Sequence, residues 1–177
     1  FGAKGRDQGE FWYPLGIDVD ADGNIYVADS GNRRIQIFRP DHRFVAAIDL
    51  PGRNGEPWDP TDVAVDANRN RLYVVDNDHH RFHVCDLSSY KLLDTVGGPG
   101  DQELMFRYPF FIALNDEGYL HIVDVINTRV QVINPNGSFA AYIGAGGVEK
   151  GQFFRPKGVA VDTAQRVGKN GATDSVA

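Results

Sequence analysis

A 25-residue pattern recurs along this chain, and the recurrence limits the possible folds more than any other feature. The pattern begins at Pro14 as PLGIDVDADGNIYVADSGNRRIQIF, returns from Pro60 and from Pro109, and starts a fourth time at Pro156. The four starts are separated by 46, 49 and 47 residues. A period of roughly 40–50 residues made of short strands is typical of propeller blades.

Each full repeat predicts four short strands. Residues 16–20 alternate apolar and acidic side chains, which indicates a half-buried strand, and Asp22-Gly23 suits a hairpin turn. Residues 25–28 are apolar on both faces, as expected of a strand covered on both sides. The sequence therefore predicts an all-β fold, a β-propeller segment of four-stranded antiparallel blades, with first strands starting near Gly16, Asp62 and Phe111.

The repeats also define the expected boundaries. We expect blades at about 14–50, 60–96 and 109–144, and the start of a further blade at 156–167, so that the propeller segment covers residues 1–167. Residues 168–177 are small and polar and form a poorly specified tail. Closed propellers usually have four to eight blades. We therefore expect the remaining blades to come from the same, longer polypeptide.

Composition narrows the classes of partner. The net charge is −6 and the basic residues are scattered, which opposes binding to a phosphate backbone. No apolar run approaches the 18 residues of a membrane span. A single cysteine excludes an internal disulfide. The compartment is left open, although removal of a signal peptide would fit an extracytoplasmic location.

Three further features recur with the pattern: Pro-x-x-[Ile/Val], an Asp that ends the second strand, and Asn-x-Arg at the third strand. In the first repeat they are Pro14, Asp29, Asn32 and Arg34, preceded by a glycine-rich connector at residues 1–11. With these features the chain resembles the NHL-repeat family of β-propellers. The resemblance implies a six-bladed ring that serves as a protein-interaction platform and sometimes binds RNA. A related amidating lyase is an enzyme on a similar ring.

An acid and an arginine five residues apart occur in every full repeat. We interpret them as structural ion pairs that tie the hairpin connections, because a functional site is normally built once rather than in each blade. The pairs are Asp29 with Arg34, Asp76 with Arg81, and Asp124 with Arg129.

Two patterns resemble metal sites, and we expect neither to bind a metal. Asp18, Asp20, Asp22 and Asp29 match the spacing of a helix-flanked calcium loop, but strand patterns flank them here. His79 and His80 are adjacent and should point apart, so they should not converge with His83 on a metal. Cys85 occupies an apolar strand position and is expected to be a buried hydrophobe. We therefore predict no catalytic residue, metal or cofactor.

In up-and-down blades, the loops between second and third strands share one face with the inter-blade connectors. Aromatic and arginine side chains, which protein interfaces favour, are frequent there. Phe11, Phe106 and Phe153 recur regularly and are expected to wedge between blades. The expected partner-binding face comprises Trp12, Arg33, Trp58, His79, His80, Tyr108 and Asn127.

The leading functional hypothesis is a non-enzymatic protein-interaction scaffold or an accessory subunit of a multi-subunit complex, docking through this face. The main alternative is a metal-dependent lyase or hydrolase of the amidating-lyase-like propeller type. An RNA-binding propeller is the third hypothesis. It ranks last because the net negative charge of the chain opposes RNA binding.

Overall fold

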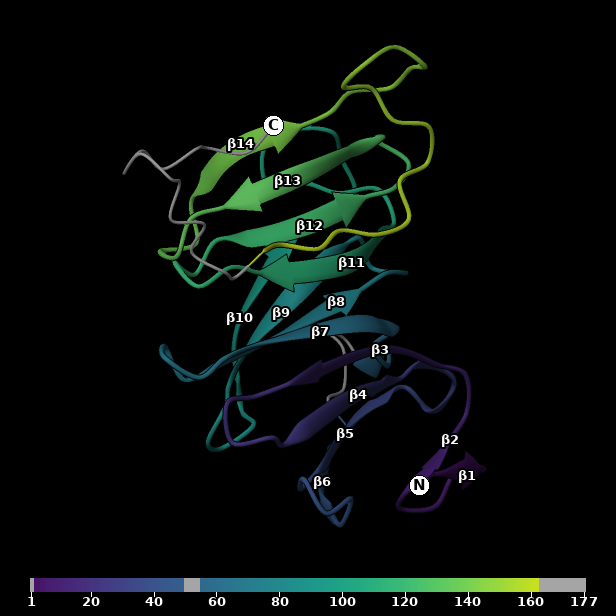
Figure 1. Ribbon diagram of the computed structural model, residues 1–177. Helices are drawn as coiled ribbons and strands as arrows, with labels where there is room; N and C mark the ends of the chain where they lie inside the picture. Colours follow the sequence, from purple (N-terminus) through teal and green to yellow (C-terminus); the bar gives the residue numbers. More distant parts are fainter. Residues whose placement is uncertain (1, 50–54, 163–177) are drawn as a thin grey trace.

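Three four-stranded antiparallel sheets follow one another along the chain in the computed structural model, which describes residues 2–49 and 55–162 (Figure 1). This confirms the predicted propeller blades. Blade 1 contains β3 (Pro14–Val19), β4 (Ile25–Asp29), β5 (Arg34–Phe38) and β6 (Phe44–Ile48). Blade 2 contains β7 (Pro60–Asp66), β8 (Arg71–Asp76), β9 (Arg81–Asp86) and β10 (Leu92–Gly97). Blade 3 contains β11 (Pro109–Leu114), β12 (Leu120–Asp124), β13 (Arg129–Ile133) and β14 (Phe139–Ile143).

Two smaller elements accompany the blades. β1 (Ala3–Lys4) and β2 (Glu10–Phe11) pair in parallel within the connector that precedes blade 1. A 3-10 turn, η1 (Ser30–Asn32), lies between β4 and β5. No helix among the described residues is long and apolar enough to span a membrane.

The first strands begin two residues earlier than expected, each at a proline. A register irregularity follows the proline in every blade, so pairing resumes at Gly16, Asp62 and Ile112. Proline lacks the amide donor that a regular ladder needs, which is why it occurs at strand starts and bulges.

Neighbouring blades pack through their first two strands, and β3, β7 and β11 lie in sequence order (Figure 1). Carboxylates on one first strand accept amide hydrogens from the next. Asp18 accepts from Val65 N at 2.8 Å, and Asp62 accepts from Ile112 N at 3.0 Å. These bonds fix the stagger between blades. Burial raises the pKa of Asp62 to about 6, although the hydrogen bonds that its carboxylate accepts act to lower it.

Two hydrophobic cores lie between the blades rather than inside any one of them. The core between blades 1 and 2 includes Ile37, Trp58 and Leu72, and the core between blades 2 and 3 includes Phe82 and Phe106. A single sheet has two apolar faces and can cover them only against its neighbours. The strands β4 and β5, β7 and β8, and β12 and β13 are accordingly buried along most of their length.

The fourth start of the repeat is only partly described. Residues 156–162 form no strand, but Val159 and Val161 line the same hollow as side chains of β3, β7 and β11. Residues 163–167 and the expected tail at 168–177 lie outside the described residues.

Candidate interaction face

The turns between second and third strands meet the inter-blade connectors on one face of the three blades. The contacts are main-chain hydrogen bonds that recur from blade to blade. Gly31 N donates to Trp12 O at 2.7 Å, Asn77 N to Asp59 O at 3.0 Å, and Ile126 N to Arg107 O at 3.1 Å. We call this surface the loop face. In Figure 1 it includes the turn from β12 to β13 at the right of the molecule.

A fully buried aspartate ends the second strand of each blade. It lies beneath the surface of the loop face and bonds to the segments that form this face. Asp29 accepts hydrogen bonds from Arg34 Nε at 2.8 Å and from Trp12 N at 2.7 Å. Its second oxygen also accepts from Asn32 Nδ2 at 2.9 Å and Gln36 Nε2 at 3.1 Å. The carboxylate therefore ties the turn, the third strand and the connector together.

Blade 3 repeats this arrangement position by position. Asp124 accepts from Arg129 Nε at 2.9 Å and from Arg107 N at 2.7 Å. Asn127 Nδ2 donates to it at 2.8 Å, and Gln131 Nε2 at 3.3 Å. Asn127, which was expected on the partner face, is therefore a half-buried part of the blade framework.

Blade 2 keeps the Asp–Arg pair but replaces both amide side chains with histidines. Asp76 accepts from Arg81 Nε at 3.0 Å, and its carboxylate contacts His79 Nδ1 at 2.8 Å and His83 Nε2 at 2.9 Å. Burial opposes ionisation of Asp76, but these imidazoles and the Asp59 amide hold its pKa well below the ordinary range. We call Asp76, His79, Arg81 and His83 the blade 2 hub.

His83 is a buried member of this hub. Burial lowers its pKa, although the neighbouring Asp76 carboxylate pulls the other way. In the neutral form, Nε2–H donates to Asp76 and Nδ1 accepts from Thr95 Oγ1 at 3.0 Å. His79 is held between Asp76 and Glu56, whose carboxylate lies 3.2 Å from Nε2, so it is only half-exposed.

Trp58 does not lie on the loop face, and this corrects the expectation from the sequence. Its side chain is 3% exposed and stacks on the His83 ring at a centroid distance of 3.5 Å. Trp58 lies two residues before Pro60, as Trp12 lies two residues before Pro14. However, Asp59 N, not Trp58 N, bonds to the blade 2 aspartate, so Trp58 occupies the position of Phe106. It is the wedge between blades 1 and 2.

Of the three phenylalanines expected to wedge between blades, Phe106 is the one that packs between two described blades. Phe106 is fully buried and packs edge-on against Phe82 of the preceding blade, with ring centroids 6.1 Å apart. Phe11 contacts Phe38 with centroids 5.7 Å apart. Phe153 forms a parallel bridge with Gly146 and is half-buried.

The remaining expected residues do reach the surface of the loop face. Arg33 is exposed, and Trp12 is half-buried beneath Lys4, whose Nζ lies 4.6 Å from the ring centroid. Tyr108 is 47% exposed and packs edge-on against His80 at 4.4 Å, and its amide donates to His80 Nδ1 at 3.0 Å. The two adjacent histidines thus point to different partners, as predicted.

Two exposed aromatics belong to the connectors at this face and are not among the residues expected on the partner-binding face. Tyr13 is 72% exposed and Phe154 is 82% exposed. Tyr13 and Tyr108 both directly precede the proline of a blade and both have a positive φ, of 50° and 55°. The dipeptide Tyr-Pro at repeat starts was the signal that could have identified Tyr13.

The calcium-like spacing forms a hairpin turn, as the sequence predicted. Asp20 accepts from Asp22 N at 3.0 Å, Asn24 N at 2.8 Å and Tyr26 Oη at 3.1 Å, while residues 25–29 form β4. Its oxygens are therefore engaged within the turn. Within residues 2–49 and 55–162, no group of three or more His, Cys, Asp or Glu side chains is placed to hold a metal ion. Cys85 is fully buried, and burial raises the pKa of its thiol to about 12.

Repeated four-stranded antiparallel sheets with adjacent first strands and inter-blade cores define the β-propeller class. A family model described as NHL repeat matches residues 11–38 and 58–85, which lie in blades 1 and 2. Blades 1 and 2 thus each match an NHL repeat.

Two curated relatives illustrate how much of a longer protein such a segment can represent. "Protein brain tumor" of Drosophila melanogaster is 27% identical over 140 residues, which are 78% of this chain and 13% of that protein. "E3 ubiquitin-protein ligase TRIM71" of Rattus norvegicus is 46% identical over 44 residues, which are 25% of this chain and 5% of that protein. The chain thus spans a small part of both relatives.

Solved structures share the fold at low identity. A streptogramin B lyase superposes with a TM-score of 0.58 at 20% identity, covering 78% of this chain and 41% of that chain. An auxiliary nutrient binding protein from Bacteroides thetaiotaomicron gives a TM-score of 0.63 at 14% identity, covering 83% and 42%. These likenesses show the fold alone, which hosts both a lyase and a binding protein.

Proposed function

We propose that this protein is a non-enzymatic docking platform, or an accessory subunit of a larger assembly, that binds protein partners through the loop face. The observation that carries the proposal is the display of Tyr13, Tyr108 and Arg33 at one surface of the blades. Tyrosine and arginine are the residue types that most often dominate binding energy at protein interfaces.

The loop face is also rigidly held, which supports a binding role. The residues before the two tyrosines, Trp12 and Arg107, are each bonded through N to a buried aspartate and through O to a turn amide. A surface whose main chain is fixed loses little conformational freedom when a partner binds. The buried hubs therefore stabilise the platform, while the exposed side chains make the contacts.

The experiment is to locate the partner's footprint. Immobilised protein is used to capture a partner, the captured protein is purified, and hydrogen exchange is compared in the free and bound states. We expect protection in the turns at 30–33, 77–80 and 125–128 and in the connectors beside them. Protection confined to the outer strands β6 and β10 would contradict docking through this face.

The competing enzyme hypothesis makes a different prediction. A metal-dependent lyase or hydrolase would purify with stoichiometric zinc or calcium, which elemental analysis of the native protein measures. The docking proposal expects neither metal at stoichiometric levels. RNA binding is the third possibility, and the net charge of −6 opposes it.

A further inference from the structure

His80 and Tyr108 join two blades on the loop face. His80 lies in the turn between β8 and β9, and Tyr108 lies in the connector that leads into blade 3. The Tyr108 amide donates to His80 Nδ1 at 3.0 Å, and the two rings pack edge to face with centroids 4.4 Å apart. Tyr108 is one of the two tyrosines assigned to docking above, so this contact sets the position of a binding residue.

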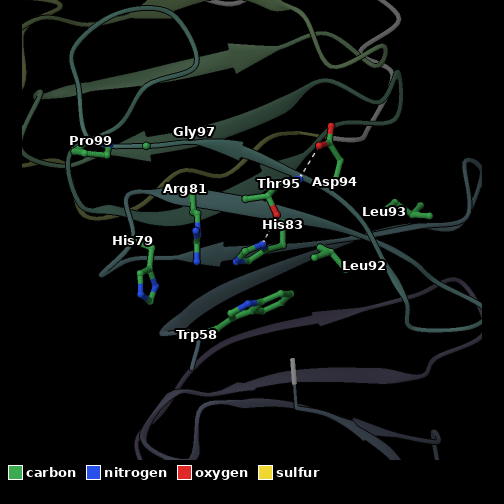
Figure 2. Close-up of a pocket in the computed structure, with 11 residues that line it drawn as sticks. Trp58, His79, Arg81, His83, Leu92, Leu93, Asp94, Thr95, Gly97 and Pro99 are labelled. Atoms are coloured by element: carbon green, nitrogen blue, oxygen red, sulfur yellow. Dashed lines mark hydrogen bonds between the residues drawn. The ribbon is translucent and has the colours of Figure 1, made fainter. Parts of the chain in front are cut away.

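His80 stands apart from the hub that its neighbours form. Figure 2 shows the His79 and His83 side chains directed to the same side of blade 2. Both rings bond to the buried Asp76 carboxylate, whereas the ring of His80 bonds to the connector. The contact made by His80 can therefore change without breaking the hydrogen bonds of the hub.

In the part of the chain that the structure describes, this contact occurs in blade 2 alone. Arg33 and Thr128 occupy the turn position of His80 in blades 1 and 3, and the φ angles of all three lie between 55° and 58°. Arginine has donors but no acceptor, and the Thr128 hydroxyl donates to Asn127 O at 2.7 Å. An arrangement built in one blade indicates a role beyond holding the repeats together.

The direction of the bond from Tyr108 to His80 fixes the protonation state of the imidazole. A main-chain amide can only donate, so Nδ1 must offer its lone pair, and the hydrogen of the neutral ring lies on Nε2. In the protonated ring both nitrogens carry hydrogen, and two N–H groups would then face each other. Protonation of His80 therefore removes the bond.

The charges around His80 act in both directions. Burial lowers its pKa most, and His79 in the same turn and Arg107 in the connector lower it further. Asp78 in the turn and Asp124 at the end of β12 raise it. The resulting pKa lies below the ordinary histidine value of ~6.5, so the neutral ring and its bond predominate at neutral pH.

The main chain on both sides of Tyr108 is held independently of His80. Arg107 N bonds to the buried aspartate of blade 3, and Asn77 Nδ2 donates to Pro109 O at 2.8 Å. Loss of the bond to His80 would therefore free the tyrosine without unfolding the connector.

We propose that neutral His80 acts as a latch that holds Tyr108 in position for docking, and that protonation of His80 releases it. Binding of a partner to the latched form must then expel a proton in acid. Docking through the loop face therefore weakens as the pH falls through the pKa of His80, by up to about tenfold for each pH unit below it. The proposal rests on the docking function above and adds its regulation by protons.

The latch itself is measured without a partner, by NMR on the protein labelled with 15N at histidine and tyrosine. At pH 7.5 the imidazole shifts of His80 should show hydrogen on Nε2 and none on Nδ1, with a scalar coupling to Tyr108 N across the hydrogen bond. The coupling should disappear as His80 titrates. A neutral ring protonated at Nδ1, or a Tyr108 amide signal that does not follow the titration, would overturn the proposal.

His80→Asn tests the consequence for docking, with the captured and purified partner as the probe. Asn Oδ1 replaces Nδ1 as an acceptor, does not titrate, and tolerates a positive φ. Parent affinity should fall in acid relative to that of His80→Asn, and titration of the partner itself cancels in this comparison. His42→Asn is the matched control, because His42 also has a positive φ, of 67°, but lies in the β5–β6 turn at the opposite end of blade 1. It should keep the pH dependence of the parent.

Coinciding pH profiles of the parent and His80→Asn would also rule out the latch. Failure of the docking function shows at any pH, as an exchange footprint outside the loop face. Failure of the latch shows in the NMR titration of the free protein, so the two failures are distinguishable.

Discussion

At the residue scale, Arg129 should stabilise blade 3 through its ion pair with Asp124. Its side chain is 11% exposed and pairs with the fully buried Asp124 carboxylate. Arg129→Ala would leave that charge without its partner, which typically costs about 3–5 kcal/mol. We expect the free energy of unfolding in urea to fall by that order. Arg107→Ala is the control, because Arg107 contacts Asp124 through its amide and not its side chain. Equal stability of the two variants would contradict the structural role.

His83 should make the stability of blade 2 depend on pH. Burial lowers its folded-state pKa, so as the pH falls through the ordinary histidine pKa of ~6.5 the unfolded chain takes up a proton before the folded chain does. Stability is therefore present above that pKa and falls as the pH falls through it. His83→Gln, which restores the residue type of Gln36 and Gln131, should lose less stability over this range.

The measurement is the difference in melting temperature between pH 7 and pH 5 for the parent and His83→Gln. Asp62, whose pKa is raised to about 6, titrates in the same range with the opposite sign, since its neutral form is favoured in the fold. Comparing the two proteins cancels that contribution. His42→Gln, at an exposed turn, is the control. Identical pH dependence in all three proteins would show that His83 does not titrate on unfolding.

At the scale of the element, the hairpin between β3 and β4 depends on the side chain of Asp20. Asp20 accepts bonds from two turn amides, from Asn24 Nδ2 and from Tyr26 Oη. Asp20→Ala should lower the free energy of unfolding by about 1–3 kcal/mol, because it leaves half-buried donors unpaired. Asp22→Ala, whose side chain is exposed in the same turn, should change it little. Calorimetric titration with calcium should show no site; a site abolished by Asp20→Ala would contradict the hairpin interpretation.

The strands could be predicted from sequence because each blade repeats the same alternation, and a period of two is a local property. The connectors could not be placed equally well. Trp58 was expected at the surface because it is a connector aromatic outside the recurring set Phe11, Phe106 and Phe153, but blade 2 lacks the residue that Tyr13 and Tyr108 supply before the proline. Because this one residue is missing, Trp58 lies in the core between blades 1 and 2 and not at the surface. The hydrogen bond from Asp59 N to Asp76 reveals this one-residue shift.

The chemistry of the blade 2 hub was also beyond sequence reasoning. The replacement of Asn and Gln by His79 and His83 is visible in the repeats, yet its effect depends on which acceptors lie nearby. A glutamine can hold a connector amide and carbonyl together, as Gln36 does with Gly9 and Glu10. His83 contacts Thr95 and Trp58 instead.

At the scale of the whole molecule, the leading edge of blade 1 is unlike the equivalent edges of blades 2 and 3. Ile17 is 62% exposed, whereas Val63 and Ile112, at the same strand position, are 2% and 6% exposed. We propose that further blades of the same type cover this edge. Residues 1–177 alone should then self-associate in sedimentation experiments, and Ile17→Ser with Val19→Ser should reduce the association. A monodisperse parent protein with a cooperative melt would show that three blades suffice.

The central claim is that the buried hubs hold the loop face while its exposed side chains bind a protein partner. Its most direct test measures affinity for the purified partner and melting temperature together in the double variant Tyr13→Ala, Tyr108→Ala. We predict that affinity falls about tenfold or more while the melting temperature stays within about 2 °C of the parent, because both side chains are surface contacts. Unchanged affinity accompanied by a lower melting temperature would contradict the account, since it would make the two tyrosines part of the framework.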